Sequence, residues 1–345
     1  MSLLASLLLT IVALSVQAES CVPAAAAAVP APAQDAEADT PPPTDQAVRV
    51  PADDAPSEPR GRLLFTRQLA GRDDLFVLHL PEGRIEQLSD HAAKDSHGAV
   101  APDARQIAFC SERRGWWKIW LMDADGSGGE QLTHPASGAD YAPCWSPDGQ
   151  DLAYVSGSLG NGDVLRLDLE EGVTQNLTDH PARDNFPAWS PDGNTIVFAS
   201  DRADDHWALY AMPAEGGAEV RQLTQDGEAI EPAWFPAGDR LVWQGYTDDI
   251  EHPQLWTQQL RDQQPVGAPR RLSDGTSSDE RPAVSPDGRW IAFESDRAGG
   301  SQLFLIPAEG GSPRQLTDEG YCYAAAWWPD SEDLAPQRPD APATR

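Results

Sequence analysis

Residues 185–224 read NFPAWSPDGNTIVFASDRADDHWALYAMPAEGGAEVRQLT and contain the unit that decides the fold. Within it, SPDG suits a type I β-turn, because Pro presets φ at the second position and Gly is favoured at the fourth. The residues around this turn are rich in β-branched and aromatic types that alternate with others, as in β-strands. The polar loop SDRADD, a third strand ALYAM, a Gly-rich turn and a short strand RQLT follow. The segment therefore predicts four short antiparallel strands.

The same unit recurs along the chain. WSPDG stands at 145–149 as well as at 189–193, and related turns are VAPDA at 100–104, WFPAG at 234–238, VSPDG at 284–288 and WWPDS at 327–331. The Leu of the fourth strand recurs at intervals of 44, 45, 46, 49 and 44 residues: Leu88, Leu132, Leu177, Leu223, Leu272 and Leu316. Four short strands at this period are typical of a β-propeller blade. No segment carries a helical apolar period of useful length.

The two ends of the repeat predict how the ring closes. The first unit, residues 62–89, has no turn-bearing strand before it, and the last such strand, residues 323–331, has no unit after it. Placing the C-terminal strand innermost in the first blade leaves no open edge between first and last blade. We expect an all-β fold: one six-bladed β-propeller over residues 60–331, with four antiparallel strands per blade.

The pattern PxWSPDG…SDR…QLT resembles the TolB-like, WD40-like propeller repeats, which also occur in the prolyl oligopeptidase family. Residues 185–224 and 281–317 match it closely, and the resemblance covers 60–331. For TolB-like proteins it implies docking of a lipoprotein partner on a propeller face. TolB carries an α/β domain before its propeller and prolyl oligopeptidases carry a hydrolase domain after theirs, and we identify neither here. Function must therefore be argued from the site.

The N-terminal residues predict export. Residues 3–16 form an apolar run of signal-peptide length, too short for a membrane span, and we expect a signal peptide over residues 1–20. Cleavage after Ala18 would release a periplasmic protein. Cys21 offers the alternative of lipidation, which would make the protein an outer-membrane-anchored lipoprotein. We expect no transmembrane span.

Amino-acid composition and net charge limit the classes of partner that the protein can bind. Residues 21–59 are Ala/Pro-rich and acidic and predict a disordered tether, and we expect a disordered tail over 332–345. The net charge is −30, from 55 acidic against 25 basic side chains, so the surface should repel nucleic acid. It favours cations and basic protein patches, although solubility or a high-salt habitat explains the same charge.

Catalytic motifs are absent from the sequence. There is no G-x-S-x-G, H-E-x-x-H or P-loop pattern, and no Cys/His spacing indicates a zinc site. We expect no cofactor and no metal ligands, with calcium at an acidic channel mouth as the alternative. In an exported chain, Cys110 and Cys144 could form a disulfide, and the sequence leaves this open.

One column of the repeat carries acidic residues. Five residues before the Trp of the turn, four of six blades have an aspartate, where each innermost strand is expected to begin and to ring one mouth of the channel. With their neighbours in the next two columns, they form a predicted binding funnel of these residues: Asp95, Asp140, Asp184, Asp279, Glu280, Glu231, Arg281, His97, Tyr141 and Asn185. The alternative is that the aspartates cap turns and pair with the arginines of the SDR loops.

The tryptophans divide into two groups. Those before the turns should pack between blades: Trp145, Trp189, Trp234 and Trp327. Trp116 and Trp117, in the loop RRGWWKIW, are the better ligand candidates; Trp116 should be exposed, whereas Trp117 should be half-buried.

These observations predict a non-enzymatic, exported propeller that serves as a protein- or peptide-binding scaffold in the bacterial cell envelope. We expect a monomer whose partner is an envelope protein or peptide, of basic character if it meets the acidic funnel. The alternatives are a propeller enzyme, such as a channel-metal lyase or a hydrolase-related protein, and a saccharide-binding module. A cluster of His and acidic residues inside the channel would favour the enzyme.

Overall fold

The computed structural model describes residues 58–329, except 135–137, 204–205, 218, 226 and 248–250. The chain divides into two units, Met1–Asp53 and Asp54–Arg345, and all described residues belong to the second. The expected signal peptide (1–20), Cys21, nearly all of the expected tether (21–59) and the expected tail (332–345) lie outside the described residues. These expectations stay predictions.

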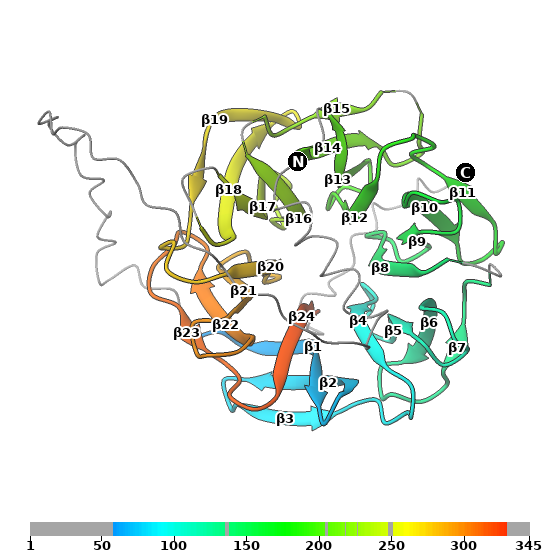
Figure 1. Cartoon of the computed structure of the whole chain (residues 1–345), viewed down its shortest axis with the longest axis vertical. Coiled ribbons are helices and arrows are strands. Elements are labelled where there is room, and N and C mark those ends of the chain that lie inside the picture. The colour runs from blue at the N-terminus through cyan, green and yellow to red at the C-terminus, as the bar shows by residue number, and fades with distance from the viewer. Residues whose placement is uncertain are drawn as a thin grey trace, which may run out of the picture. The chain divides into compact units, whose positions relative to one another are not determined.

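Six four-stranded antiparallel sheets surround a common centre (Figure 1). The innermost strands are β24 (Tyr321–Trp328), β4 (Asp95–Val100), β8 (Asp140–Trp145), β12 (Asp184–Trp189), β16 (Glu228–Trp234) and β20 (Asp279–Val284). The second strands are β1 (Gly61–Leu69), β5 (Gln106–Ser111), β9 (Asp151–Ser156), β13 (Thr195–Ala203), β17 (Arg240–Tyr246) and β21 (Trp290–Ser295). The third strands are β2 (Arg72–Leu80), β6 (Lys118–Asp123), β10 (Asp163–Asp168), β14 (His206–Pro213), β18 (Gln254–Arg261) and β22 (Gln302–Pro307). The outer strands are β3 (Arg84–Gln87), β7 (Glu130–Gln131), β11 (Thr174–Asn176), β15 (Arg221–Gln222), β19 (Gln264–Arg271) and β23 (Arg314–Gln315).

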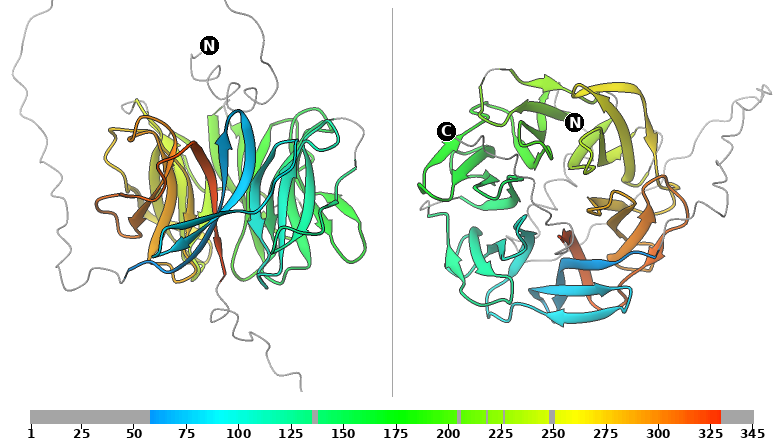
Figure 2. Two further views of the ribbon diagram at one scale, coloured as in Figure 1. Left: turned by 90° about the horizontal axis from the view of Figure 1, so that it is seen from below. Right: turned by 180° about the vertical axis from the view of Figure 1, so that it is seen from behind.

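The predicted all-β, six-bladed fold is confirmed. We number the blades in chain order: blade 1 contains β24, β1, β2 and β3, blade 2 contains β4–β7, and each later blade takes the next four strands through β20–β23 in blade 6. The predicted closure is also confirmed, because β24 pairs with β1 along the register from Arg62↔Trp328 to Gln68↔Tyr321. Figure 2 shows the two chain ends of the ring side by side in this sheet.

The SPDG segment forms the tight turn that its residues predict. In blade 3 the Gly149 N–H donates to the Ser146 carbonyl at 2.9 Å, and Gly149 has φ of 73°. The Ser146 hydroxyl oxygen accepts from the Asp151 N–H at 2.9 Å and donates to Asp148 Oδ1 at 2.6 Å. The turn thus satisfies its own polar groups and leads directly into the second strand.

The core lies between neighbouring sheets. Trp145 of blade 3 packs with Cys110 and Ile119 of blade 2, and its indole N–H donates to the Ala99 carbonyl at 3.0 Å. The corresponding indoles of Trp234 and Trp327 donate to Ala188 and Ala283 of the preceding blades. The tryptophans of the turns therefore join blades, as predicted.

Candidate channel site

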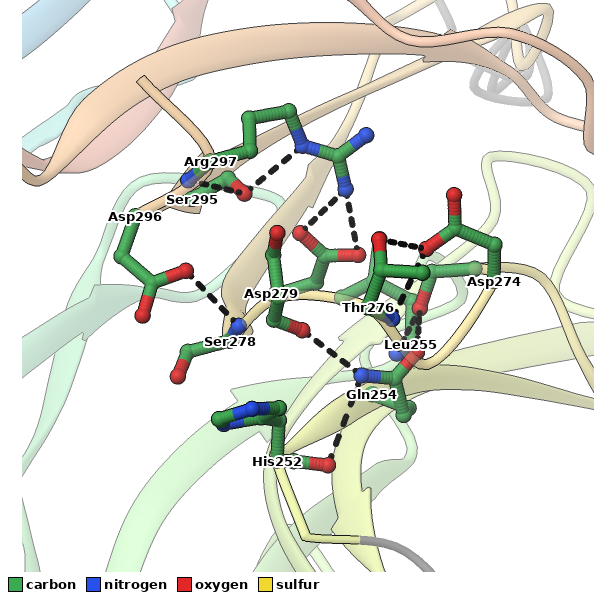
Figure 3. Close-up of polar contacts among 12 residues, drawn as sticks. His252, Gln254, Leu255, Asp274, Thr276, Ser278, Asp279, Ser295, Asp296 and Arg297 are labelled. Atoms are coloured by element: carbon green, nitrogen blue, oxygen red, sulfur yellow. Dashed lines mark hydrogen bonds and ion pairs between the residues drawn. The ribbon is translucent and has the colours of Figure 1, made fainter. Parts of the chain in front are cut away.

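The four aspartates of the predicted funnel are fully buried at the starts of the innermost strands: Asp95, Asp140, Asp184 and Asp279, each 0% exposed. Three of them bind an arginine from the same blade, which lies near the end of the second strand or just after it. The N–O distances are 2.7 Å for Arg113–Asp95, 2.8 Å for Arg202–Asp184 and 2.6 Å for Arg297–Asp279. Figure 3 shows the last pair, with both carboxylate oxygens of Asp279 facing the guanidinium.

Blade 3 has no arginine in this loop, and another cation takes its place. Lys118, which begins β6 in the neighbouring blade 2, contacts Asp140 at 3.1 Å, and the Ser156 hydroxyl donates to the same carboxylate at 2.6 Å. Each aspartate is therefore neutralised within the ring of sheets, and none of the four lines the channel cavity. The sequence predicted that these carboxylates ring an open mouth of the channel, and the structure does not place them there. The alternative, pairing with the arginines of the SDR loops, is confirmed for Asp184 and Asp279. The reason is that these four aspartates are buried beside cationic side chains of the same or a neighbouring blade.

The side chains that line the channel come from a bulge two residues further along each innermost strand. At this place all six blades have a residue in the left-handed region, with φ between 48° and 54°: His97, Ala142, Phe186, Glu231, Arg281 and Ala324. The pairing with the second strand shifts register here, as between Asn185 and Ala188 in blade 4. Such a bulge redirects a side chain that a regular pleat would place elsewhere. We call these six residues the bulge ring.

The bulge ring lines a channel cavity of about 430 Å³. Much of the remaining wall is apolar, with Phe186, Pro187, Trp189, Pro232 and Trp234 among the lining residues. His97, Glu231 and Arg281 of the predicted funnel lie on this wall. The structure thus places these three at the channel, and their role in binding stays a prediction; the sequence did not reveal the bulge that orients them.

Charges gather on the wall formed by blades 5 and 6. Arg281 Nε lies 3.0 Å from Glu231 Oε1, and Arg281 Nη1 lies 2.8 Å from Glu294 Oε2. Glu294 Oε1 also accepts a hydrogen bond of 2.7 Å from the Ala324 N–H, across to β24 of blade 1. Glu280 adjoins Arg281 in the chain and faces Glu294 across the β20–β21 ladder. We call Glu231, Glu280, Arg281 and Glu294 the channel charge cluster.

Burial changes the acidity of this cluster. It raises the pKa of both Glu231 and Glu280 to about 7, against the opposing attraction of Arg281. It also raises the pKa of Glu294. Burial, together with the positive charge of Arg281, lowers the pKa of His97 to about 3. At neutral pH His97 is thus uncharged, whereas two carboxyl groups are close to their midpoints.

Glu294 was missed by sequence reasoning. It lies on β21 and is 3% exposed, in a column that otherwise reads Thr66, Cys110, Val155, Ala199 and Gln244. A single carboxylate among small or neutral residues was the available signal. Thr66 has a comparable role, because its hydroxyl oxygen accepts from the His97 N–H at 3.1 Å, so this column caps the bulge of the next blade.

Two predicted funnel residues form a separate contact. The Tyr141 hydroxyl donates to Asn185 Oδ1 at 2.7 Å, which links blade 3 to blade 4. Burial raises the pKa of Tyr141 to about 12, so it remains a donor at neutral pH. This pair stands beside the channel and is not part of the cavity wall.

Four exposed apolar side chains lie on the face where the innermost strands begin, which we call the mouth face. Leu69 ends β1 and Tyr321 begins β24, while Trp116 and Leu159 lie in the loops after the second strands of blades 2 and 3. Their exposed fractions are 44%, 49%, 53% and 61%. The exposure expected for Trp116 and the partial burial expected for Trp117 are both confirmed.

Other predicted features can be located within residues 58–329. Cys110 and Cys144 are free thiols, so the disulfide left open by the sequence is not formed. Among the described side chains, no three His, Cys, Asp or Glu come together as metal ligands. The described part of the chain also contains no helix with the length and hydropathy of a membrane span.

The propeller repeats of this chain match a known protein family. The family model for the TolB β-propeller domain matches residues 130–261 and 224–341. The chain belongs to this family. Because its members share the repeat, the match accounts for the blades and leaves the choice of ligand open.

Individual relatives agree with this assignment. The uncharacterized protein Atu1656 of Agrobacterium fabrum is 29% identical over 191 residues, which are 54% of this chain and 60% of that protein. The Tol-Pal system protein TolB of Anaeromyxobacter dehalogenans is 27% identical over 134 residues, 38% of this chain and 29% of that protein. This chain therefore matches less than two thirds of the length of these relatives.

A solved structure shares the fold. TolB from Acinetobacter baumannii superposes with a TM-score of 0.68 at 21% identity, over 78% of this chain and 67% of that one. At this identity the likeness shows the fold alone.

Proposed function

We propose that this protein is an exported, non-enzymatic TolB-type propeller that binds another envelope protein or a peptide on its mouth face. The observation that carries the proposal is the distribution of exposed apolar side chains. Six large hydrophobic residues of the described part are well exposed, and four of them lie on the mouth face: Leu69, Trp116, Leu159 and Tyr321. Concentrated exposed apolar surface marks interaction sites, whereas scattered single residues do not.

The position of these residues supports a binding role. They come from the consecutive blades 1, 2 and 3, around the end of the channel where the innermost strands begin. Aromatic residues such as Trp116 and Tyr321 are frequent anchors of protein interfaces. The name of the Anaeromyxobacter relative refers to the Tol-Pal system, which supports an envelope partner.

The experiment compares variants of the two faces. Purified wild-type protein is used as bait in bacterial envelope extract, beside Trp116→Ser and Leu69→Ser on the mouth face. Val173→Ser is the matched control, because Val173 is 57% exposed in the turn between β10 and β11 at the opposite face. We expect a partner that the wild type and Val173→Ser capture and that both mouth-face variants lose. Equal capture by all four proteins would overturn the proposal.

The N-terminal residues define a second part of the proposal. We infer export, with either cleavage after Ala18 or lipidation of Cys21. The mass of the mature protein, isolated from wild type and from Cys21→Ala, separates these outcomes. A diacylglyceryl mass increment that is lost in Cys21→Ala means anchoring, a mature chain that begins at Glu19 means a free periplasmic protein, and an uncut chain contradicts export.

A further inference from the structure

The channel cavity has one charged wall and is otherwise mainly apolar. Glu231 and Arg281 line it directly, and Glu280 and Glu294 stand next to Arg281. The channel charge cluster thus contains three carboxyl groups and one guanidinium group. Across the ring, blades 2 and 3 contribute His97 and Ala142, and Phe186 of blade 4 lies next to blade 5.

Glu231 lines this cavity and has a buried acceptor atom without a hydrogen-bond partner among the described residues. Its side chain is 9% exposed, and within the described part of the protein its Oε2 atom has no hydrogen-bond partner. Arg281 contacts the other carboxylate oxygen, Oε1. A buried carboxylate oxygen without a hydrogen-bond donor destabilises the folded state, so a ligand that supplies a donor would be favoured there.

The neighbouring residues do not supply that donor. His97 Nδ1 lies 3.1 Å from the Ser96 hydroxyl, and neither ring nitrogen of His97 is hydrogen-bonded to Glu231 Oε2. Arg281 already bridges Glu231 and Glu294. The carboxyl groups of Glu280 and Glu294 are acceptors when ionised and repel a further anion.

We propose that the charged wall of the channel binds a single primary ammonium or guanidinium group, with Glu231 Oε2 as its acceptor. This inference rests on the proposed function, because the group is carried by the partner segment that enters at the mouth face. The apolar wall at Phe186, Pro187 and Trp234 accommodates the aliphatic stem of a Lys or Arg side chain. A volume of about 430 Å³ lies within the range of small-ligand sites.

The site differs from the one expected from the aspartate column. Those four carboxylates are already neutralised by Arg113, Arg202, Arg297 and Lys118. The acidic excess instead comes from blades 5 and 6, where Glu231 and Glu280 have pKa values of about 7. An incoming cation favours their ionised forms, so binding releases protons below about pH 7.

The pH dependence follows from the groups around the cation. Glu231, Arg281 and His97 line the cavity that would hold it, and Glu280 and Glu294 lie next to Arg281. Tyr246 and Tyr323 also adjoin the cluster, and burial raises the pKa of both, so they stay neutral over pH 5–8. Affinity should therefore increase between pH 5.5 and pH 8 as Glu231 and Glu280 lose their protons.

The test uses the capped pentapeptide Ac-Ala-Ala-Lys-Ala-Ala-NH2, its norleucine counterpart and free spermidine as probes. Binding to the full chain is measured by equilibrium dialysis at low salt, at pH 5.5 and pH 8. We expect binding of the lysine peptide, stronger at pH 8, and at least tenfold weaker binding of the norleucine peptide. Glu231→Gln should weaken the lysine peptide about tenfold, as expected for loss of one charge-assisted hydrogen bond.

Two further variants keep the result interpretable. Glu280→Gln changes a second member of the cluster and should also weaken binding, whereas Glu130→Gln, an exposed residue of β7, should not. Thermal unfolding of each variant establishes that it is folded. Equal binding of the lysine and norleucine peptides, or unchanged binding by Glu231→Gln, would overturn the inference.

The remaining outcomes separate this inference from the proposed function. If partner capture depends on Trp116 but the lysine peptide does not bind, the cation site is wrong and the mouth-face proposal stands. If spermidine binds through Glu231 but the peptide does not, the ammonium site stands and its protein-borne source is wrong. If the peptide binds while no partner depends on the mouth face, the cation site remains and the proposed function falls.

Discussion

Backbone conformation at single residues decides which side chains line the channel. The bulge ring places six non-glycine residues at φ near +50°, a region that costs roughly 1 kcal/mol or more for a residue with a Cβ atom. The cost is offset by contacts such as the hydrogen bond from the His97 N–H to Thr66 Oγ1 and that from the Ala324 N–H to Glu294 Oε1. In return, each innermost strand directs one side chain into the channel.

Glycine at the end of the SPDG turn permits a first residue-scale prediction. Gly193 has φ of 74°, and a Cβ atom there would meet only Pro147 at an ordinary 3.9 Å, so strain and not crowding decides its replacement. We expect Gly193→Val to destabilise the protein by about 1–3 kcal/mol. Ala104 has φ of 60° at the matching place in blade 2 and already bears part of this strain, so Ala104→Val should cost less. Urea unfolding measures both, and equal losses would contradict the turn assignment.

Glu280 permits a prediction on pH. Burial raises its folded-state pKa from 4.5 to about 7, with Arg281 opposing and Glu294, Asp296 and Asp279 adding to the rise. The folded state thus favours the neutral carboxyl group, and this contribution to the free energy of unfolding is fully present below about pH 4.5. It is lost as the pH rises through 7. Glu280→Gln, which stays neutral, should match the wild type at pH 5 and exceed its stability at pH 8.

The size of this effect follows from the shift in pKa. We expect a difference on the order of 1–3 kcal/mol at pH 8, measured by urea unfolding at both pH values. Glu130→Gln on the surface is the control and should follow the wild type throughout. A Glu280→Gln variant that is less stable than the wild type at pH 8 would show that the ionised carboxylate is a net stabilising partner of Arg281.

At the scale of elements, the start of the innermost strand in blades 2, 4 and 6 is tied to an arginine at or after the end of the second strand. Asp279 opens β20, and Arg297 follows β21, which runs back to the same end of the blade. The Arg297 guanidinium also lies over the rings of Phe293 and Phe304, at 5.7 and 5.2 Å. The same arrangement holds Arg113 and Arg202 in blades 2 and 4. Each Asp–Arg pair therefore links the innermost strand of its blade to the end of the second strand.

Breaking such a pair should cost stability. Asp279→Asn leaves the half-buried Arg297 without its counter-charge, and we expect a loss of roughly 3 kcal/mol in urea unfolding. Asp90→Asn is the control, because Asp90 is 77% exposed and its pair with Arg72 should contribute less than about 1 kcal/mol. Similar small effects from both substitutions would mean that Asp279 contributes no more than a surface charge.

At the scale of the whole propeller, stability depends on the strand contributed by the C-terminal part of the chain. β24 completes blade 1, and its Trp328 is 2% exposed in a cluster with Phe109 and Met122 of blade 2. Without β24, the edge of β1 would present unpaired N–H and C=O groups next to the channel. The two ends of the repeat are therefore interdependent although some 250 residues separate them.

This dependence predicts the effect of truncation. Deleting residues 321–345 should abolish the cooperative thermal transition or cause aggregation, because it removes β24 and exposes β1. Deleting residues 22–57, outside the described residues, should leave the melting temperature nearly unchanged, since the Ala/Pro-rich composition predicts no contribution to the core. A truncated protein that melts like the full chain would contradict closure through β24.

The sequence by itself determined the architecture. Turn chemistry at SPDG, alternation in the flanking strands and the recurring Leu predicted blades, their number and closure by residues 323–331. These features are local, or repeat at a constant interval, so each copy reinforces the others. The packing of the turn tryptophans between blades also followed from the repeat column.

The tertiary structure alone decided which charges face the channel. The aspartate column was conspicuous in the sequence, yet its side chains turn inward to Arg and Lys residues brought near by the second strand or by a neighbouring blade. Glu231, Arg281 and Glu294 meet because bulges rotate the first two into the cavity while blade 5 lies against blade 6. No residue type at these positions favours a left-handed conformation by itself, and packing between blades imposes it. Side-chain direction at a bulge therefore depends on contacts distant in the sequence, which repeat alignment cannot supply.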